Sequence, residues 1–299
     1  MPTYLALALA AYFFLAVTGL IDKVLLQTTI VSPRAYAFYV GLLSVLAIFL
    51  LPFGVVSVPD RRTILAAAVS GIAGVYALWA FYSALKEHEA SRVITTVGAL
   101  IPIFTLALSV IFLDEFLGIF QLLGFFTLLL GGIAVSLREN VKKTYTLALF
   151  NQAAQSAILF AVSLTFMRFV FLYETFLNGL FWVRLGGLIG ALSIIAVPEN
   201  FRRIYWATKK APKAASVPFL LNQGLGGLGG LLQNYAVSLG SAALVGAIQG
   251  VQYAFLFVLA LFFSRYFPQL RERIRSREAV KKMVAIVVIG FGLYFLTIK

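Results

Sequence analysis

The sequence contains no cysteine and few charged residues. Among its 299 residues there is one histidine, and Asp, Glu, Lys and Arg together make up only 12%. The absence of cysteine excludes disulfides and thiolate metal sites. A soluble domain carries about 25% charged residues, whereas this chain is 62% hydrophobic with a mean hydropathy of +0.97. These values exclude an ordinary soluble fold and indicate that lipid surrounds most of the chain.

Long polar segments are also missing, and the chain is divided instead into ten apolar runs. The runs lie near residues 4–21, 35–57, 63–85, 93–113, 116–137, 145–167, 176–197, 214–239, 241–264 and 283–298. Each has about 18 to 25 residues, enough for a helix to cross a hydrocarbon core of about 30 Å. We therefore predict an all-α integral membrane protein with ten transmembrane helices and no separate soluble domain in the links.

Glycines in the eighth run resemble a nucleotide-binding motif. Gly224, Gly226 and Gly229 spell G-x-G-x-x-G within NQGLGGLGGLLQNY. A dinucleotide site needs a strand before this motif and a helix after it, but these glycines lie midway along an apolar run. We interpret them as small residues at which helices approach closely in lipid, and we expect Gly227 to serve the same purpose. No cofactor is predicted.

The second half of the sequence repeats the first. SGIAGVYALWAFY, residues 70–82, aligns with QGLGGLGGLLQNY, residues 223–235, so that Gly71, Gly74 and Tyr82 fall on Gly224, Gly227 and Tyr235. We predict two five-helix repeats, residues 1–140 and 141–299. An odd number of helices in each repeat inserts the second one upside down, an architecture typical of secondary transporters. The alternative is a duplication that serves stability alone.

One segment carries a family resemblance. Residues 84–137, ALKEHEASRVITTVGALIPIFTLALSVIFLDEFLGIFQLLGFFTLLLGGIAVSL, combine a helix-end Ala-Leu, a mid-helix proline (Pro102), the turn Asp114–Leu117 and a glycine-rich fifth helix. This pattern resembles the repeat of the EamA-like transporters of the drug/metabolite transporter superfamily. The resemblance implies ten helices, with the third, fourth, eighth and ninth around a central cavity, and does not name a substrate. The second repeat departs from it, since Ala254 replaces the proline and a basic loop replaces the turn.

The basic residues are distributed unequally between the two faces of the predicted bundle. Most of the 24 Lys and Arg lie in links after odd-numbered runs, so the positive-inside rule predicts that these links are cytoplasmic and both termini outside. The resemblance implies the reverse orientation. We expect a multi-pass protein of the prokaryotic cytoplasmic (inner) membrane. The net charge of +13, and above all the cluster RERIRSREAVKK at residues 271–282, predicts contact with anionic lipid headgroups and no nucleic-acid partner.

The few ionisable groups do not favour an enzyme. His88 stands between Glu87 and Glu89 in a short link, where a charged cap at the membrane surface explains it better than catalysis. No second histidine and no intramembrane carboxylate is available for metal binding or acid-base chemistry. Glu115 is expected to cap its turn or to pair across the link. We predict no catalytic residue and no metal site.

Polar residues inside the runs are the best candidates for solute contact, because polar groups in lipid are costly and usually face a cavity. On the eighth run Gln223, Gly227, Gly230 and Asn234 share one helical face. The complete set of candidates is Tyr76, Trp79 and Tyr82 in the third run, Thr95 and Thr96 in the fourth, Gln223, Gln233 and Asn234 in the eighth, Gln249, Gln252 and Tyr253 in the ninth, and Arg184 in the seventh. The alternative is that these groups only join helices through hydrogen bonds.

Arg184 is the only charged residue inside a run. It is the ninth residue from Phe176 and so lies about 12 Å from one end of the helix. Arginine at this depth costs about 2.5 to 3.5 kcal/mol on insertion scales. Snorkelling, backbone carbonyls or Asn178 would offset this cost in a purely structural role. Alternatively, a carboxylate or phosphate of the solute is the partner, held by the guanidinium fork.

The sequence thus predicts a secondary transporter that moves a small organic metabolite, amino-acid-like or carrying an anionic group, by alternating access. The spans contain no acidic residue, which favours a facilitator or exchanger over a proton-driven antiporter. The alternative is a membrane scaffold or partner-binding protein that transports nothing.

Overall fold

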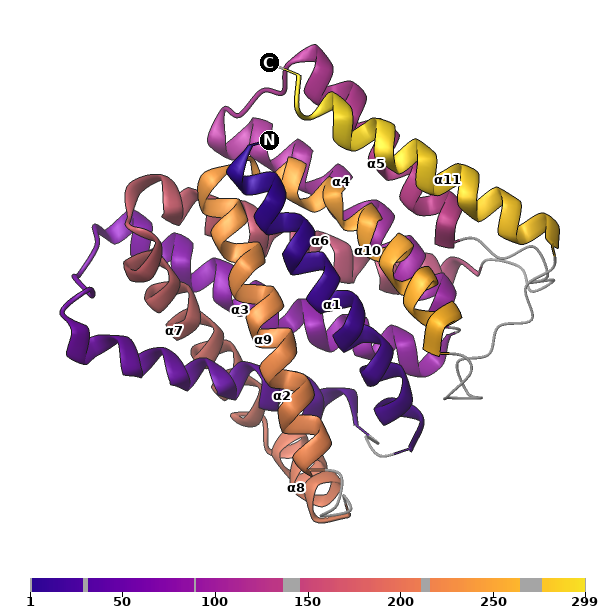
Figure 1. Ribbon diagram of the computed structural model, residues 1–299. Coiled ribbons are helices and arrows are strands. Elements are labelled where there is room, and N and C mark those ends of the chain that lie inside the picture. Colours follow the sequence, from indigo (N-terminus) through magenta and orange to yellow (C-terminus); the bar gives the residue numbers. More distant parts are fainter. Residues whose placement is uncertain are drawn as a thin grey trace.

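The computed structural model describes residues 2–28, 32–88, 90–136, 146–210, 216–263 and 276–298. Within these ranges the chain forms eleven α-helices and one 3₁₀ helix (Figure 1). They are α1 (Thr3–Thr28), α2 (Pro33–Leu42), η1 (Leu43–Phe53), α3 (Arg61–Glu87), α4 (Ala90–Leu113), α5 (Ile119–Ser136), α6 (Leu147–Tyr173), α7 (Phe176–Ile195), α8 (Pro198–Lys210), α9 (Ser216–Leu239), α10 (Ala242–Phe263) and α11 (Ser276–Phe295). The prediction of an all-helical membrane protein is confirmed.

Seven helical segments of the described residues are long and apolar enough to cross a membrane. They lie in α1, α2 with η1, α3, α4, α6, α7 and α10, where α2 and η1 run without a break from Pro33 to Phe53. The other three predicted spans coincide with α5, α9 and α11. The apolar part of α5 is shorter, from Ile119 to Val135, while glycine and amide side chains lower the hydropathy of α9.

Short links make successive long helices alternate in direction. Figure 1 shows both chain ends at the same end of the molecule, which we call the terminal side. The starts of α3, α5, α7 and α10 also lie on the terminal side, and the starts of α2, α4, α6, α9 and α11 lie on the opposite side. Helix α3 begins at Asp60, whose carboxylate accepts a hydrogen bond from the backbone N–H of Arg62 at 2.9 Å. The hydrogen bond from the Thr63 hydroxyl holds the pKa of Asp60 below its ordinary value.

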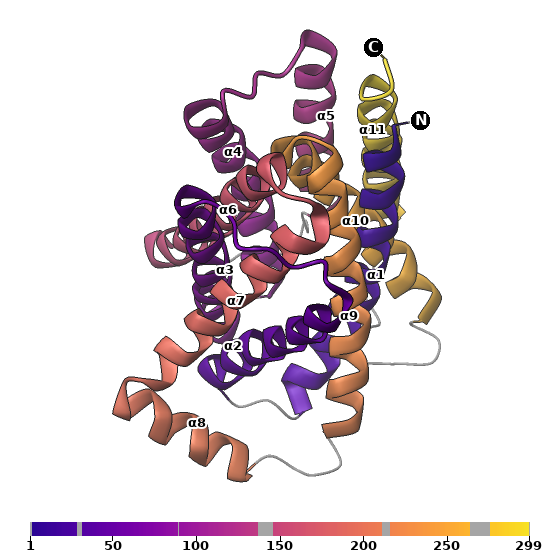
Figure 2. The ribbon, with the colours of Figure 1, turned by 90° about the vertical axis from the view of Figure 1, so that its left-hand side faces the viewer.

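The first helix of each sequence half packs against the other half. Helix α1 lies against α9 and α10, and α6 lies against α3 and α4. Figures 1 and 2 show α1 beside α9 and α10 in both views. The main hydrophobic core forms where α1 packs against the second half, and it joins Leu5 and Tyr12 of α1 to Val237 and Ile248.

Small residues bring α3 and α7 to backbone contact. A Cβ atom at Gly71 would overlap the backbone of Gly187 and the carbonyl oxygen of Val183. One at Gly186 would lie 2.6 Å from the carbonyl oxygen of Ala67. These two helices therefore pack without side chains between them, as small residues allow in lipid.

Only part of the G-x-G-x-x-G motif packs against a helix. A Cβ atom at Gly226 would lie 3.1 Å from Thr18, and one at Gly229 would lie 3.1 Å from Leu15, so these two glycines face α1. Gly224 and Gly227 would meet nothing within 4 Å. The prediction that Gly227 is a packing residue is therefore wrong, because it lies on a different face of α9 from the one that α1 covers.

Helix α8 was not predicted, because its sequence PENFRRIYWATKK is too short and too polar for a span. Figure 2 shows it between the end of α7 and the start of α9. Ile204 is buried, whereas Phe201, Tyr205 and Trp206 are exposed. Two features of the sequence would have indicated a short helix here. They are the proline at the first helical position and the apolar residues spaced by three and four.

Residues 271–275 of the predicted lipid-binding cluster lie outside the described residues, and residues 276–282 form the first two turns of α11. The last residue of the cluster, Lys282, is 6% exposed, with Nζ 4.7 Å from the ring centroid of Phe257. Lys282 therefore packs against α10, while the contact of the cluster with anionic headgroups stays a prediction.

Candidate functional site

One face of α9 is open. Gly224, Gly227 and Gly230 recur at intervals of three residues, and a Cβ atom at any of them would meet nothing within 4 Å. Gln223 and Asn234 are partly buried on the same side of the helix. Side chains at the three glycine positions would fill the space beside this face, so the glycines keep it free.

Aromatic side chains contact the opposite-side end of this face. Tyr36, in the first turn of α2, is 2% exposed. Its ring centroid lies 4.3 Å from that of Tyr82 on α3 and 5.4 Å from that of Phe219 on α9. Gln223 Nε2 donates a hydrogen bond to the Tyr36 hydroxyl at 2.5 Å. The predicted site residues Tyr82 and Gln223 are thus brought together by Tyr36, a residue that the sequence did not single out among the other aromatics of α2.

A second aromatic contact lies toward the terminal side. Phe176, the first residue of α7, has its ring centroid 4.8 Å from that of Tyr235 near the end of α9. Tyr235 is 40% exposed, so this contact is looser than the one around Tyr36. Between Gln223 and Tyr235 the open face of α9 extends over about 18 Å.

Arg184 lies in the middle of α7, whose first residue contacts the end of α9. Helices α7 and α9 are antiparallel and meet at Phe176 and Tyr235. Arg184 follows Phe176 by eight residues and Gly227 precedes Tyr235 by eight residues, so both lie about 12 Å from this contact. Arg184 is partly buried and keeps some accessible surface.

Two predicted site residues form a cluster with an arginine near the opposite side. Trp79 on α3 lies beneath the guanidinium carbon of Arg34, which is 5.5 Å from the ring centroid. Tyr76 stacks on Trp79 at 5.7 Å and shares a 2.9 Å hydrogen bond with the Ser193 hydroxyl. This cluster belongs to the packing of α3 on α2 and α7.

Gln233 and Tyr253 join helices. Gln233 Nε2 donates to the Tyr12 hydroxyl at 3.2 Å, and Tyr12 donates in turn to the carbonyl oxygen of Val245 at 2.8 Å. Tyr253 donates to the carbonyl oxygen of Ile94 at 3.1 Å and is 7% exposed. For these two residues the structure favours the alternative that polar groups only connect helices.

The remaining predicted residues divide between two places. Asn234 is partly buried on the open face of α9. Thr95 and Thr96 on α4 and Gln249 and Gln252 on α10 belong to a different pair of packed helices. Thr95 is buried, and the other three are partly buried. Helix α9 makes little contact with α10, so the α10 glutamines do not join the face of Gly227.

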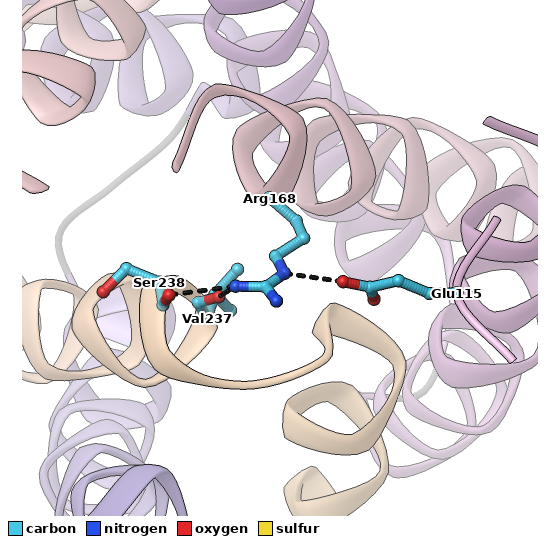
Figure 3. A network of polar contacts seen from close by, with 4 residues as sticks. All are labelled: Glu115, Arg168, Val237 and Ser238. Atoms are coloured by element: carbon cyan, nitrogen blue, oxygen red, sulfur yellow. Dashed lines mark hydrogen bonds and ion pairs between the residues drawn. The ribbon is translucent and has the colours of Figure 1, made fainter. Parts of the chain in front are cut away.

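An ion pair ties three helices together on the terminal side (Figure 3). Arg168 Nε of α6 donates to Glu115 Oε1 in the link between α4 and α5 at 2.8 Å. Arg168 Nη1 donates to the carbonyl oxygens of Val237 and Ser238, at the end of α9, at 3.1 and 2.9 Å. The expected pairing of Glu115 is thereby confirmed, and the arginine also neutralises the negative end of the α9 dipole.

The chain has recognisable relatives. Residues 2–137, which include α1 to α5, match the model of the EamA-like transporter family. No curated protein matches the sequence. Of 19 matching chains of solved structures, one crystal structure has a TM-score of 0.68 at 15% identity and covers 99% of this chain and 96% of its own. At this identity the similarity shows a shared fold, and the family match confirms the resemblance found in the sequence.

Proposed function

We propose that this chain, which over residues 2–137 belongs to the EamA-like transporter family, is a secondary transporter with ten transmembrane helices in two inverted repeats. We further propose that it moves a small organic metabolite by alternating access in a prokaryotic cytoplasmic membrane. The proposal depends mainly on one observation, the placement of the two aromatic contacts at either end of the open face of α9.

The two contacts are made by equivalent positions of the repeat. Tyr82 and Tyr235 align in the sequence and lie near the ends of α3 and α9. Each stacks on an aromatic residue in the first turn of the second helix of a repeat, Tyr36 in α2 and Phe176 in α7. The Tyr82 contact is on the opposite side and the Tyr235 contact on the terminal side. Two equivalent closures on opposite sides of one space are what alternating access between inverted repeats requires.

The packing of the first helix of each half against the other half supports the same proposal. The contact of α6 with α3 and α4 is repeated by the contact of α1 with α9 and α10, as a two-fold relation between the halves predicts. Tyr36 is almost fully buried and Tyr235 is not. The opposite-side closure is therefore the tighter one, and transport requires that the ring of Tyr36 separate from α9.

Flux measurements test this function. The purified protein is first screened by thermal shift against amino acids, nucleosides, sugars and organic acids, because a ligand of the folded state raises its stability. Hits are then assayed for flux in sealed vesicles. We expect transport by the parent and at least about a fivefold change in rate for Tyr36→Ala, equivalent to about 1 kcal/mol. Tyr294→Ala, which alters an exposed tyrosine of α11, is the control and should match the parent.

Two results would contradict the proposal. Absence of flux for every solute would favour the scaffold alternative. Equal transport rates in the parent and in folded Tyr36→Ala would show that the contact of Tyr36 with α9 has no part in the transport mechanism.

The orientation is a separate prediction. We propose that the terminal side faces outward, because most Lys and Arg lie in links on the opposite side. In this cysteine-free chain, Val58→Cys in the exposed link before α3 should react with an impermeant maleimide in intact cells, and Arg202→Cys in α8 should react only after lysis. The reverse pattern would favour the orientation that the family resemblance implies.

Helix α8 supports a lipid contact on the predicted cytoplasmic side. Exposed Phe201 and Tyr205 lie beside Arg202, and Lys209 lies with Nζ 5.2 Å from the ring centroid of Trp206. Aromatic and basic residues on a short amphipathic helix suit the boundary between acyl chains and anionic headgroups. We propose that α8 lies in this boundary.

A further inference from the structure

Arg184 has no partner among the described residues. No carboxylate or carbonyl oxygen there accepts a hydrogen bond from its guanidinium, so backbone carbonyls do not offset its charge. Asn178, one of its candidate partners, instead donates to Glu174 at 2.6 Å and to Ser57 at 3.0 Å. Glu174, the nearest acidic group along the chain, is thereby engaged elsewhere, so the charge of Arg184 is not balanced by the described residues.

The space beside Arg184 is suited to a ligand. Arg184 lies as far along α7 from the contact between Phe176 and Tyr235 as Gly227 lies along α9. A Cβ atom at Gly227 would meet nothing within 4 Å, and the same holds one turn away at Gly224 and Gly230. The arginine is partly buried and keeps accessible surface, so an anion can reach its guanidinium. Asn234, two turns from Gly227 on the same face, is partly buried and adds an amide donor and acceptor.

We infer that Arg184 binds a carboxylate or phosphate group of the transported solute in the space that the glycines of α9 keep open. A guanidinium surrounded by protein is stabilised most by an anion, and its planar fork binds both oxygens of such a group. An uncharged or purely cationic solute would leave the arginine unpaired. The inference rests on the proposed transport function and adds the substrate class to it.

Paired solutes that differ only in their anionic groups test the inference. Succinate and glycerol 3-phosphate are compared with succinamide and glycerol by thermal shift and calorimetry on the purified protein. We expect at least one acid to bind while its neutral counterpart does not. Its affinity should fall at least about tenfold in Arg184→Gln, since a charge-assisted hydrogen bond is lost. The affinity of Arg184→Lys for the acid should lie between those of the parent and of Arg184→Gln, because a point charge replaces the planar fork.

Stability without ligand separates a binding role from a structural one. Arg184→Gln removes an unpaired charge and should melt at the same temperature as the parent or higher. Arg62→Gln, an exposed arginine in the first turn of α3, is the matched control and should bind as the parent does. The inference is overturned if no acid binds in preference to its neutral counterpart, if Arg184→Gln binds the acid as well as the parent, or if it melts well below the parent.

Flux distinguishes this inference from the proposed function. A neutral solute carried equally by the parent and by Arg184→Gln would support the proposed transport function and contradict the inference of an anionic substrate. Conversely, the acid could bind only when Arg184 is present and yet show no flux. That result would support the anion site and contradict the proposed transport function.

Discussion

Gly71→Ala should destabilise the protein more than any other single methyl group added to a glycine of α3 or α9. The three atoms nearest to a Cβ atom at Gly71 are all backbone atoms of α7, in Val183, Gly186 and Gly187. No side-chain rotation can relieve this overlap, so α3 and α7 must separate. Overpacking of a well-packed contact costs about 1 to 3 kcal/mol, and we expect at least the upper value. The melting temperature in detergent and the yield of monodisperse protein measure the effect.

Gly227→Ala is the matched control for this prediction. The added methyl group would meet nothing within 4 Å, and alanine is favoured over glycine in a helix by about 1 kcal/mol. The variant should therefore melt at the same temperature as the parent or higher. If both glycine variants lost stability equally, the difference between the packed face of α3 and the open face of α9 would be refuted.

Arg168→Gln should cause the other large loss of stability. The replacement leaves Glu115, whose side chain is 18% exposed, without its cation and removes the donor shared by the carbonyls of Val237 and Ser238. Removing one member of a buried ion pair costs about 3 to 5 kcal/mol. We expect a loss near the lower value, because both side chains keep some accessible surface. Thermal unfolding of the purified variant measures it.

An exposed ion pair provides the comparison. Arg203 and Glu199 pair within α8 at 2.5 Å, with side chains 58% and 63% exposed, and such pairs contribute about 0 to 1 kcal/mol. Arg203→Gln should therefore have little effect. A double-mutant cycle with Glu115→Gln then isolates the coupling between Glu115 and Arg168. Similar losses for Arg168→Gln and Arg203→Gln would mean that the contacts of Arg168 with Glu115 and with the end of α9 contribute little to stability.

Several features of the site could be predicted because they depend on local chemistry. An arginine within an apolar run is costly wherever the run packs, so Arg184 was identifiable from its neighbours in the sequence alone. The tyrosines at repeat-equivalent positions, Tyr82 and Tyr235, were found by aligning the two halves. The aromatic residues that stack on them, Tyr36 and Phe176, were not found, because nothing in their own segments distinguishes them from other aromatic residues.

The roles of the glycines and glutamines required the folded structure. Gly226 and Gly227 are adjacent in the sequence, yet one faces α1 and the other faces open space. Gln223 and Gln233 lie on the same helix, yet their hydrogen bonds go to Tyr36 and Tyr12 of two different helices. Which face of α9 is covered depends on the position of α1, and α1 is more than two hundred residues away from Gln233 along the chain.

The sequence by itself determined that this protein lies in a bilayer and that its long segments are helices. In lipid every backbone hydrogen bond must be made within a segment, so the length and hydropathy of each run are sufficient for that conclusion. The tertiary structure alone decided which polar side chains have partners. Gln233 and Tyr253 find hydrogen bonds on neighbouring helices and Arg184 finds none among the described residues, because these partners come from helices that are distant in the chain and meet only when it folds.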